Sequence, residues 1–454
     1  MADFNCSKTP HFPNREASLS STTSSKANTA KWLALTAAFL GWMFDGLEMG
    51  LFPLVARPAM MELMGPEKMG QFGTWMSIII AMFLVGAALG GVLFGWLGDK
   101  IGRTRAMVYS VLAYSLFSGL CAFATEPWHI AALRFLAALG MGGEWALGVA
   151  LVMEIWPGKS RPLMAGLIGA AANVGFLTVA LMSLALTSII ASVGVFLHAI
   201  LPASAADALL ANGSWRMLFL LGALPAFLTL FIRIFVPESE KWHDAVKKNV
   251  EGPKVSELFK GKLLSKTIIG SCLGAVALLG TWGSVQWIPS WGHKLANGAA
   301  GSRETLQIYS AIGAILFSIL VGVIADKLNR RWTYFLLCFI TVVACAILFR
   351  VPMEYGTTLF FWTFLVGGLS AGFYGWLPLY LPELFPTRLR ATGSGFTFNI
   401  GRLLAAGGTL GAGAMLNAFH EDYARMCAVI SLVYVVGMVI IWFGPETKGK
   451  PLPE

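Results

Sequence analysis

The stretch GWLGDKIGRTR at residues 95–105 sets a compact group of charges directly after a long apolar run. A related stretch, GVIADKLNRR at residues 322–331, follows another apolar run in the second half of the chain. Charges clustered at the end of such a run are typical of a short turn between two membrane-spanning helices. The sequence therefore predicts two related halves, each with the same charged turn.

The composition also indicates a membrane. Hydrophobic residues make up 56% of the chain and charged residues 13%, too few polar side chains to cover a water-soluble protein of this length. About 20 apolar residues span the roughly 30 Å hydrocarbon core, and the runs lack the alternation of a barrel strand, so we predict an all-α membrane protein. The twelve predicted membrane helices are residues 32–56, 72–97, 105–124, 127–153, 162–190, 215–237, 266–292, 304–326, 332–350, 357–381, 391–417 and 422–444.

Polar stretches divide the chain into five predicted segments. These are a disordered cytoplasmic tail at 1–30, a six-helix bundle at 31–240, a Lys-rich cytoplasmic linker at 241–265, a second six-helix bundle at 266–447 and a cytoplasmic tail at 448–454. An extra outer loop at 191–214 is expected in the first half only.

Most Lys and Arg residues fall on one side of this arrangement, which the positive-inside rule assigns to the cytoplasm. We therefore expect a multi-pass protein of the cell (inner) membrane with both termini cytoplasmic. The net charge of +9 is explained by this asymmetry, so it does not indicate nucleic-acid binding. The expected surroundings are a lipid bilayer, and the expected state is a monomer.

A second repeat lies on the same predicted side. Residues 154–161 read EIWPGKSR and residues 383–390 read ELFPTRLR, which share a Glu-x-x-Pro-x-x-x-Arg pattern. One interpretation is an inner gate between the halves; the alternative is that these charges only set the topology. The predicted gating residues are Asp99, Arg103, Glu383 and Arg390, with Asp326, Arg330, Glu154 and Arg161 as the symmetric set.

The charged turn at 95–105 resembles the signature loop between the second and third helices of the major facilitator superfamily of secondary transporters. The resemblance implies two six-helix bundles that rock around a central cavity. It also implies that the first and fourth helices lie beside each other along that cavity. A parallel repeat of the two halves agrees with this architecture.

Ionisable residues inside the predicted helices indicate the chemistry, since each costs at least a few kcal/mol in hydrocarbon. Asp45 and Glu48 lie three positions apart on the first helix, hence on one face. Counting about 1.5 Å per residue places Asp45 level with Arg134 of the fourth helix. With the resemblance, Asp45, Glu48 and Arg134 are expected to form one cluster. Glu144 lies nearer the cytoplasm, as a second proton site or a partner for a nearby polar group.

The second half supplies different groups. Arg402 and Asn399 lie near the middle of the eleventh helix, and the repeat pairs Arg402 with Asn173. The counterpart of Asp45 falls in a stretch without acids, so the two cavity walls are expected to be chemically unequal. The remaining candidate substrate contacts, each open to the alternative of an interfacial aromatic or polar residue, are Trp282, Gln286, Tyr374 and Trp376.

Other chemistries find little support in the sequence. The six cysteines show no close pairing and the six histidines lie in loops or at helix ends, so no metal or cofactor is indicated and carboxylates are the expected proton carriers. No set of nucleophile, base and orienting residue appears, so we do not expect an enzyme.

The stretch Asp45-Gly46-Leu47-Glu48, Arg134 before a Gly-rich turn, Gly401-Arg402 and the Pro-Glu-Ser and Pro-Glu-Thr ends of the two halves together resemble the metabolite:proton symporter branch, of aromatic-acid and sialate type. The branch carries Asp where this chain has Glu48, and the second turn has Asn329 where the pattern has Gly.

We therefore expect proton-coupled symport of a small organic anion by alternating access. In this hypothesis Asp45 carries the proton, Glu48 modulates it, and Arg134 and Arg402 bind the anion. The alternatives are a proton-coupled antiporter of organic cations, a sugar uniporter and a receptor that binds a ligand without transport.

Overall fold

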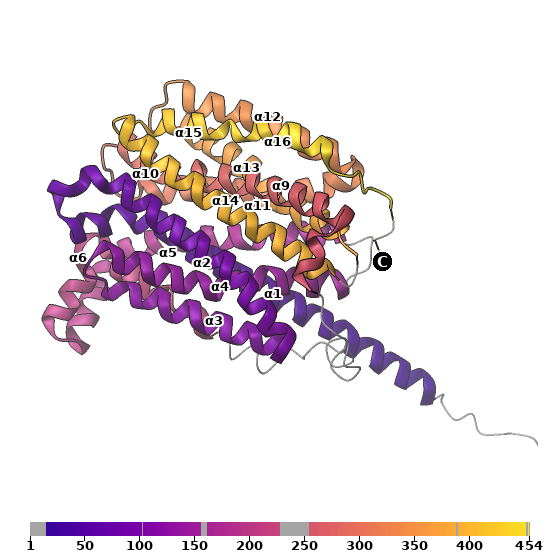
Figure 1. Ribbon diagram of the computed structural model, residues 1–454. Helices are drawn as coiled ribbons and strands as arrows, with labels where there is room; N and C mark the ends of the chain where they lie inside the picture. The colour runs from indigo at the N-terminus through magenta and orange to yellow at the C-terminus, as the bar shows by residue number, and fades with distance from the viewer. Residues whose placement is uncertain are drawn as a thin grey trace, which may run out of the picture.

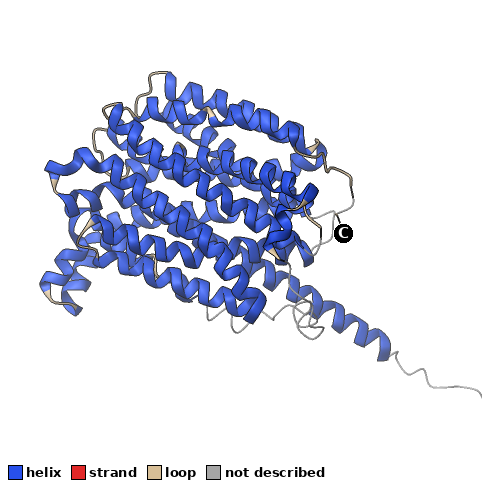
Figure 2. Cartoon of the chain, in the orientation of Figure 1, coloured by secondary structure: helices blue, strands red, loops and turns tan. Residues whose placement is uncertain are grey.

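The computed structural model describes residues 15–101, 103–155, 161–227, 254–386, 389–450 and 453. Throughout these residues the regular structure is helical (Figure 2). The α-helices of the first half are α1 (Arg15–Met64), α2 (Phe72–Ile101), α3 (Arg103–Leu120), α4 (Pro127–Ile155), α5 (Arg161–Ile200) and α6 (Ala203–Leu221). Those of the second half are α9 (Gly261–Gly283), α10 (Ile288–Leu295), α11 (Ser302–Lys327), α12 (Arg330–Arg350), α13 (Thr357–Glu383), α14 (Arg390–Ala418), α15 (Tyr423–Ser431) and α16 (Val433–Ile440). The 3-10 turns are η1 (Pro66–Gln71), η2 (Cys121–Phe123), η4 (Leu224–Phe227), η5 (Val255–Phe259), η6 (Val285–Trp287) and η8 (Ile441–Phe443).

These elements make twelve membrane crossings, as predicted. Nine helical stretches of the described residues are long and apolar enough to span a membrane, and α4 and α14 are two further long helices. The predicted sixth crossing, at 215–237, is described only as far as residue 227 and begins with the last turns of α6. Two crossings are broken: α9, η6 and α10 form one, and α15, α16 and η8 form another. Large apolar side chains point outward on several helices, such as Leu116, Leu316 and Val439, each more than half exposed. They have the character of a lipid-facing surface.

The helices run side by side in two groups (Figure 1), with α1 beginning and the C-terminus lying at the same end of the bundle. We call this end the terminus side and the opposite end the far side. In the first half α2 packs on α4 and α1 on α5; in the second half α11 packs on α13. The halves meet along two seams, α5 against α11 and α2 against α14.

Two glycines explain why α1 and α5 approach so closely. A Cβ on Gly46 would overlap the carbonyl of Ala172, and a Cβ on Gly175 would overlap the carbonyl of Met43. Backbone-to-backbone contact of this kind is how membrane helices pack without large side chains between them. The contact holds the part of α1 that carries the acidic residues firmly against α5.

Two stretches differ from the sequence expectation. Helix α1 begins at Arg15, inside the predicted disordered tail. The predicted outer loop at 191–214 is largely helical, because α5 continues to Ile200 and α6 begins at Ala203.

The helical backbone of α6 breaks only at Ala211–Ser214. The carboxylate of Glu62 fixes this break, since it accepts hydrogen bonds from Asn212, Trp215 and Arg216. Within the predicted linker, residues 254–265 form η5 and the start of α9, and the rest lies outside the described residues.

Candidate functional site

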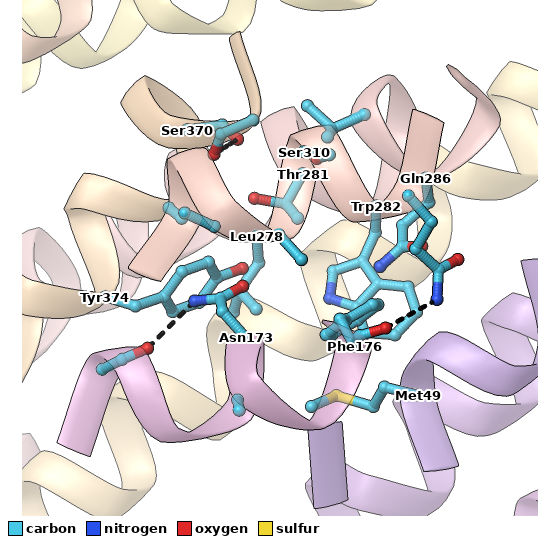
Figure 3. Close-up of a pocket in the computed structure, with 18 of the residues that line it drawn as sticks. Met49, Asn173, Phe176, Leu278, Thr281, Trp282, Gln286, Ser310, Ser370 and Tyr374 are labelled. Carbon is cyan, nitrogen blue, oxygen red and sulfur yellow. Dashed lines mark hydrogen bonds between the residues drawn. The ribbon is translucent and has the colours of Figure 1, made fainter. Parts of the chain in front are cut away.

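A cavity of about 90 Å³ lies between the two halves, with walls from α1, α2, α4 and α5 on one side and α9, α11, α13 and α14 on the other. The sequence-predicted residues on its wall are Asn173, Trp282, Gln286, Tyr374 and Arg402. In Figure 3, Asn173 and Tyr374 lie near each other at one end of the view, and Trp282 and Phe176 lie together at the other. The walls thus combine aromatic rings with neutral hydrogen-bonding groups.

Arg402 is the one charged side chain on this wall among the described residues. Its Nη1 donates to Asn399 Oδ1 at 3.2 Å and, over a longer 3.4 Å, to the carbonyl of Ala87 on α2. Its guanidinium carbon lies 4.9 Å from the centre of the Phe398 ring, within cation–π range. Asn399 therefore orients Arg402. Asn399 itself does not line the cavity. The guanidinium keeps donors for an anionic ligand.

Two buried carboxyl groups lie close to each other near the cavity, and one of them, Asp45, interacts with Arg402. Asp45 is 2% and Glu144 3% exposed, and their carboxyl groups are within hydrogen-bonding reach of each other. Asp45 also interacts electrostatically with Arg402. Oδ1 of Asp45 and Oε2 of Glu144 accept no hydrogen bond from a donor in the described part of the chain. Two carboxyl groups can hydrogen bond to each other only if one of them carries a proton.

The sequence places Arg134 at the same depth as Asp45, but in the structure Arg134 pairs with Glu48. Nη1 of Arg134 lies 2.8 Å from Oε1 of Glu48, which also accepts from Ser118. Helix α1 extends to Met64, past the predicted end at 56, so Asp45 sits nearer the terminus side than the predicted helix implied. Arg134 is buried and is not on the cavity wall. The expected cluster is thus two sites: Glu48 with Arg134, and Asp45 with Glu144.

Trp376 is another candidate that the structure places elsewhere. Its indole N–H donates to the carbonyl of Arg330 at 3.2 Å, and its ring stacks on Tyr380. It lies two residues after Tyr374, a rotation of about 200° around a helix. Tyr374 therefore faces the cavity while Trp376 packs inside the second half.

Sequence reasoning missed several neutral polar groups on the wall. Nε2 of Gln307 donates to the carbonyls of Gly50 and Phe176, both at 3.1 Å, and so ties α11 to α1 and α5. The hydroxyl-bearing side chains are Thr281, Ser310 and Ser370. Gln307 is an amide inside an apolar run of the sequence. The argument that singles out charged residues inside predicted helices could have identified it too.

Aromatic pairs bridge the halves at both ends of the cavity. On the terminus side Trp145 of α4 stacks on Phe398 of α14, with ring centres 4.1 Å apart and planes 12° apart. On the far side Phe83 of α2 lies against Trp282 of α9 at 5.5 Å. Both pairs cross from one half to the other, so each joins the two halves by side-chain contact.

Of the predicted gating residues, those with described side chains form a network inside the second half. Arg330 donates to both oxygens of Glu383, at 3.0 and 2.8 Å, and Glu383 also accepts from Thr447. Asp326 is exposed and acts electrostatically on Arg330. The side chains of Asp99, Arg103, Glu154, Arg161 and Arg390 lie outside those that the structure describes.

Glu446 extends this network, because its carboxylate accepts from the backbone at the start of α12. Partial burial on its own raises the pKa of Glu446, but backbone N–H groups donate to its carboxylate and lower the pKa overall. These donors belong to Lys448, Arg330, Arg331 and Thr447. A carboxylate at the N-terminal end of α12 also interacts favourably with the helix dipole.

Two helical halves around a central cavity, with one arginine on its wall in the described part of the chain, have the architecture of a multi-pass membrane transporter. The family comparison agrees, because residues 32–409 match the model of the Major Facilitator Superfamily. The chain belongs to this superfamily.

Similar proteins carry small organic molecules. A protein of Cupriavidus pinatubonensis named "Probable 4-methylmuconolactone transporter" is 29% identical, over 91% of this chain and 90% of its own length. The niacin transporter of Acinetobacter baylyi is 26% identical, over 91% and 93%. Among solved structures, the proton:xylose symporter of E. coli matches with a TM-score of 0.71 at 17% identity, over 94% of this chain and 98% of that one. That last likeness concerns the fold.

Proposed function

We propose that this protein is a proton-coupled symporter of a small organic carboxylate, working by alternating access in the cell membrane with its terminus side in the cytoplasm. The observation that carries the proposal is the position of Arg402. It is the charged group on the cavity wall in the described part of the chain, and it interacts with Asp45 of the Asp45–Glu144 pair.

Coupling follows from competition for Arg402. When the pair has lost its proton, Asp45 attracts the guanidinium and neutralises it. When the pair is protonated, that attraction weakens and Arg402 is free to bind the carboxylate of a substrate. Proton and anion then bind together, because each makes the binding of the other more favourable. Glu48 and Arg134 neutralise each other beside this site and serve as a fixed support.

The wall chemistry favours a flat monocarboxylate. One accessible guanidinium matches one carboxylate, because the second guanidinium, that of Arg134, is already paired with Glu48 at 2.8 Å. Trp282, Tyr374 and Phe398 offer ring faces for a planar body, and Asn173 and Gln286 offer amide groups for its polar substituents. The niacin and 4-methylmuconolactone transporters, named for compact ring compounds, support this class for the present chain.

Alternating access needs seams that open at one end at a time. The α5–α11 and α2–α14 seams, with the aromatic pairs Phe83–Trp282 and Trp145–Phe398 near their ends, are the natural gates. We place the predicted charges Asp99, Arg103, Glu154, Arg161 and Arg390 with the Arg330–Glu383 pair in a cytoplasmic gate that steadies the outward-facing state.

The test is an uptake screen with the full chain in proteoliposomes, alkaline inside, against labelled niacin, xylose and tetraethylammonium. We expect niacin or a similar monocarboxylate to accumulate above its external concentration, and a protonophore to abolish the accumulation. Equilibration of the sugar without accumulation would instead identify a uniporter. Proton-driven export of the amine from preloaded vesicles would identify the cation antiporter.

A further inference from the structure

A second group of basic side chains lies at the far side, away from the cavity wall. Arg57 is on α1 of the first half, and Arg303 is the second residue of α11 in the second half. The two guanidinium groups interact electrostatically with each other, and both interact with Tyr423 at the start of α15. Helices α10 and α15 mark this end of the bundle in Figure 1. We call Arg57, Arg303, Tyr423 and their neighbour Trp287 the far-side cluster.

The cluster contains buried donors without acceptors. Nε of Arg303, the hydroxyl of Tyr423 and Nε1 of Trp287 are all buried and have no hydrogen-bond partner in the described part of the chain. Tyr423 is 2% exposed and Trp287 is fully buried, with ring centres 6.3 Å apart. A buried donor without a partner destabilises the folded protein, because it has lost its hydrogen bond to water and gained none in return. These three donors, one of which belongs to the guanidinium group of Arg303 itself, indicate a place for an acceptor that carries negative charge.

Neither Arg57 nor Arg303 is in an ion pair with a carboxylate in the described part of the chain. Lys294 lies 3.7 Å from Glu421, so these two balance. Glu304 is the carboxylate next to Arg303, and it also accepts from Ser183 across the seam at 2.7 Å. It can balance only one of the two arginines.

Two further features favour an anion in this place. His293, whose Nδ1 lies 2.7 Å from the hydroxyl of Ser302, is neutral or positively charged and provides no negative charge to the arginines. The N-cap of α11, Gly301, has no side chain to accept from the first turn, and a helix N-terminus itself attracts anions.

We propose that the far-side cluster is a second binding site, for one monovalent anion, a carboxylate or an inorganic halide, held between Arg57 and Arg303. The two arginines come from opposite halves, so closing the far side brings like charges together. An anion between them replaces this repulsion with two attractions and satisfies the buried donors. The site therefore links anion binding to closure of the far side, and it does not depend on proton coupling at Asp45.

The first experiment separates this site from the cavity. The full chain is placed in nanodiscs with a bulky sulfonate as the only other anion, and thermal stability is titrated with chloride and with benzoate. In an Arg402→Gln background, which removes the cavity cation, we expect a saturable rise in stability to remain. Adding Arg303→Gln or Arg57→Gln should weaken that response at least tenfold, and Arg303→Lys should retain most of it. Arg350→Gln, at the exposed end of α12, is the matched control and should leave it unchanged.

The two probes identify the occupant. A response to chloride alone means a halide site, and a response to benzoate alone means a carboxylate site; either supports the proposal. Loss of every saturable response in Arg402→Gln, or an unchanged affinity in Arg303→Gln and Arg57→Gln, overturns it.

A second arm uses the unaltered chain, in case Arg402→Gln does not fold. Crystals grown in bromide, and crystals soaked with 4-bromobenzoate, are compared, and at least one of the two should show an anomalous peak between the guanidinium groups of Arg57 and Arg303. A peak at Arg402 with either probe, and none at the far-side cluster with both, contradicts the proposal. Failure of proton-driven uptake, with both arms positive, would instead count only against the proposed symport.

Discussion

Arg134 and Arg402 are both buried, yet only Arg402 lines the cavity. The difference lies in their partners. Arg134 has a full carboxylate partner in Glu48 at 2.8 Å, whereas Arg402 hydrogen bonds to an amide and a backbone carbonyl. A paired guanidinium supports the structure, and one held by neutral groups is available to a ligand.

This distinction gives a prediction for Glu48→Gln. The substitution leaves the charge of Arg134 buried without a counter-charge, which typically costs about 3–5 kcal/mol. We expect a marked loss of thermal stability in detergent, partly recovered when Arg134→Gln is added to remove the stranded charge. Equal stability of Glu48→Gln and the parent would mean that the pair is not structural.

The sequence predicts which residues are buried and charged far better than which of them meet. Residue types and burial were predictable because few ionisable groups occur inside apolar runs. The pairing of Arg134 with Glu48 in place of Asp45 was not predictable. It depends on how far α1 continues past its predicted end and on the rotation of α1 against α4. The prediction that Trp376 contacts the substrate has a similar weakness, because spacing along α13 alone does not fix which face of the helix meets the cavity.

At the scale of the element, most predicted helices match the observed ones to within a few residues, because the charged turns mark their ends. The exceptions are α1, which is longer than predicted at both ends, and the outer segment at 191–214. Small and polar residues there favoured a loop, but hydrogen bonds that Asn212 and Trp215 donate to the carboxylate of Glu62 fix the break in α6 and leave the flanking residues helical.

The start of α12 gives a prediction about pH. The pKa of Glu446 is lower in the folded protein than its ordinary value, so its stabilising contribution is present at neutral pH. That contribution is lost as the pH falls through the folded pKa. We expect Glu446→Gln to be less stable than the parent at pH 7, with the difference shrinking toward pH 4. Melting curves across this range test it, and Glu67→Gln, an exposed carboxylate on η1, is the control. A difference that grows at acid pH would contradict the account.

Over the whole molecule, the far side is closed by hydrogen bonds between the halves. Gln307 bonds to the carbonyls of Gly50 and Phe176, so Gln307→Leu removes two of these links while keeping similar volume. We expect a cysteine in place of Met49 on the cavity wall to react faster with an impermeant thiol reagent from outside. Unchanged labelling would show that closure does not depend on Gln307.

The central claim is that a proton and a carboxylate cross together because Asp45 and the substrate compete for Arg402. The most direct measurement is the internal pH of proteoliposomes holding a pH-sensitive dye while the transported carboxylate is added outside. The account predicts internal acidification with the parent and with Glu67→Gln. With Asp45→Asn it predicts none, although substrate exchange between the two sides continues. Acidification at the parent's rate in Asp45→Asn would contradict the claim and remove Asp45 from the coupling step.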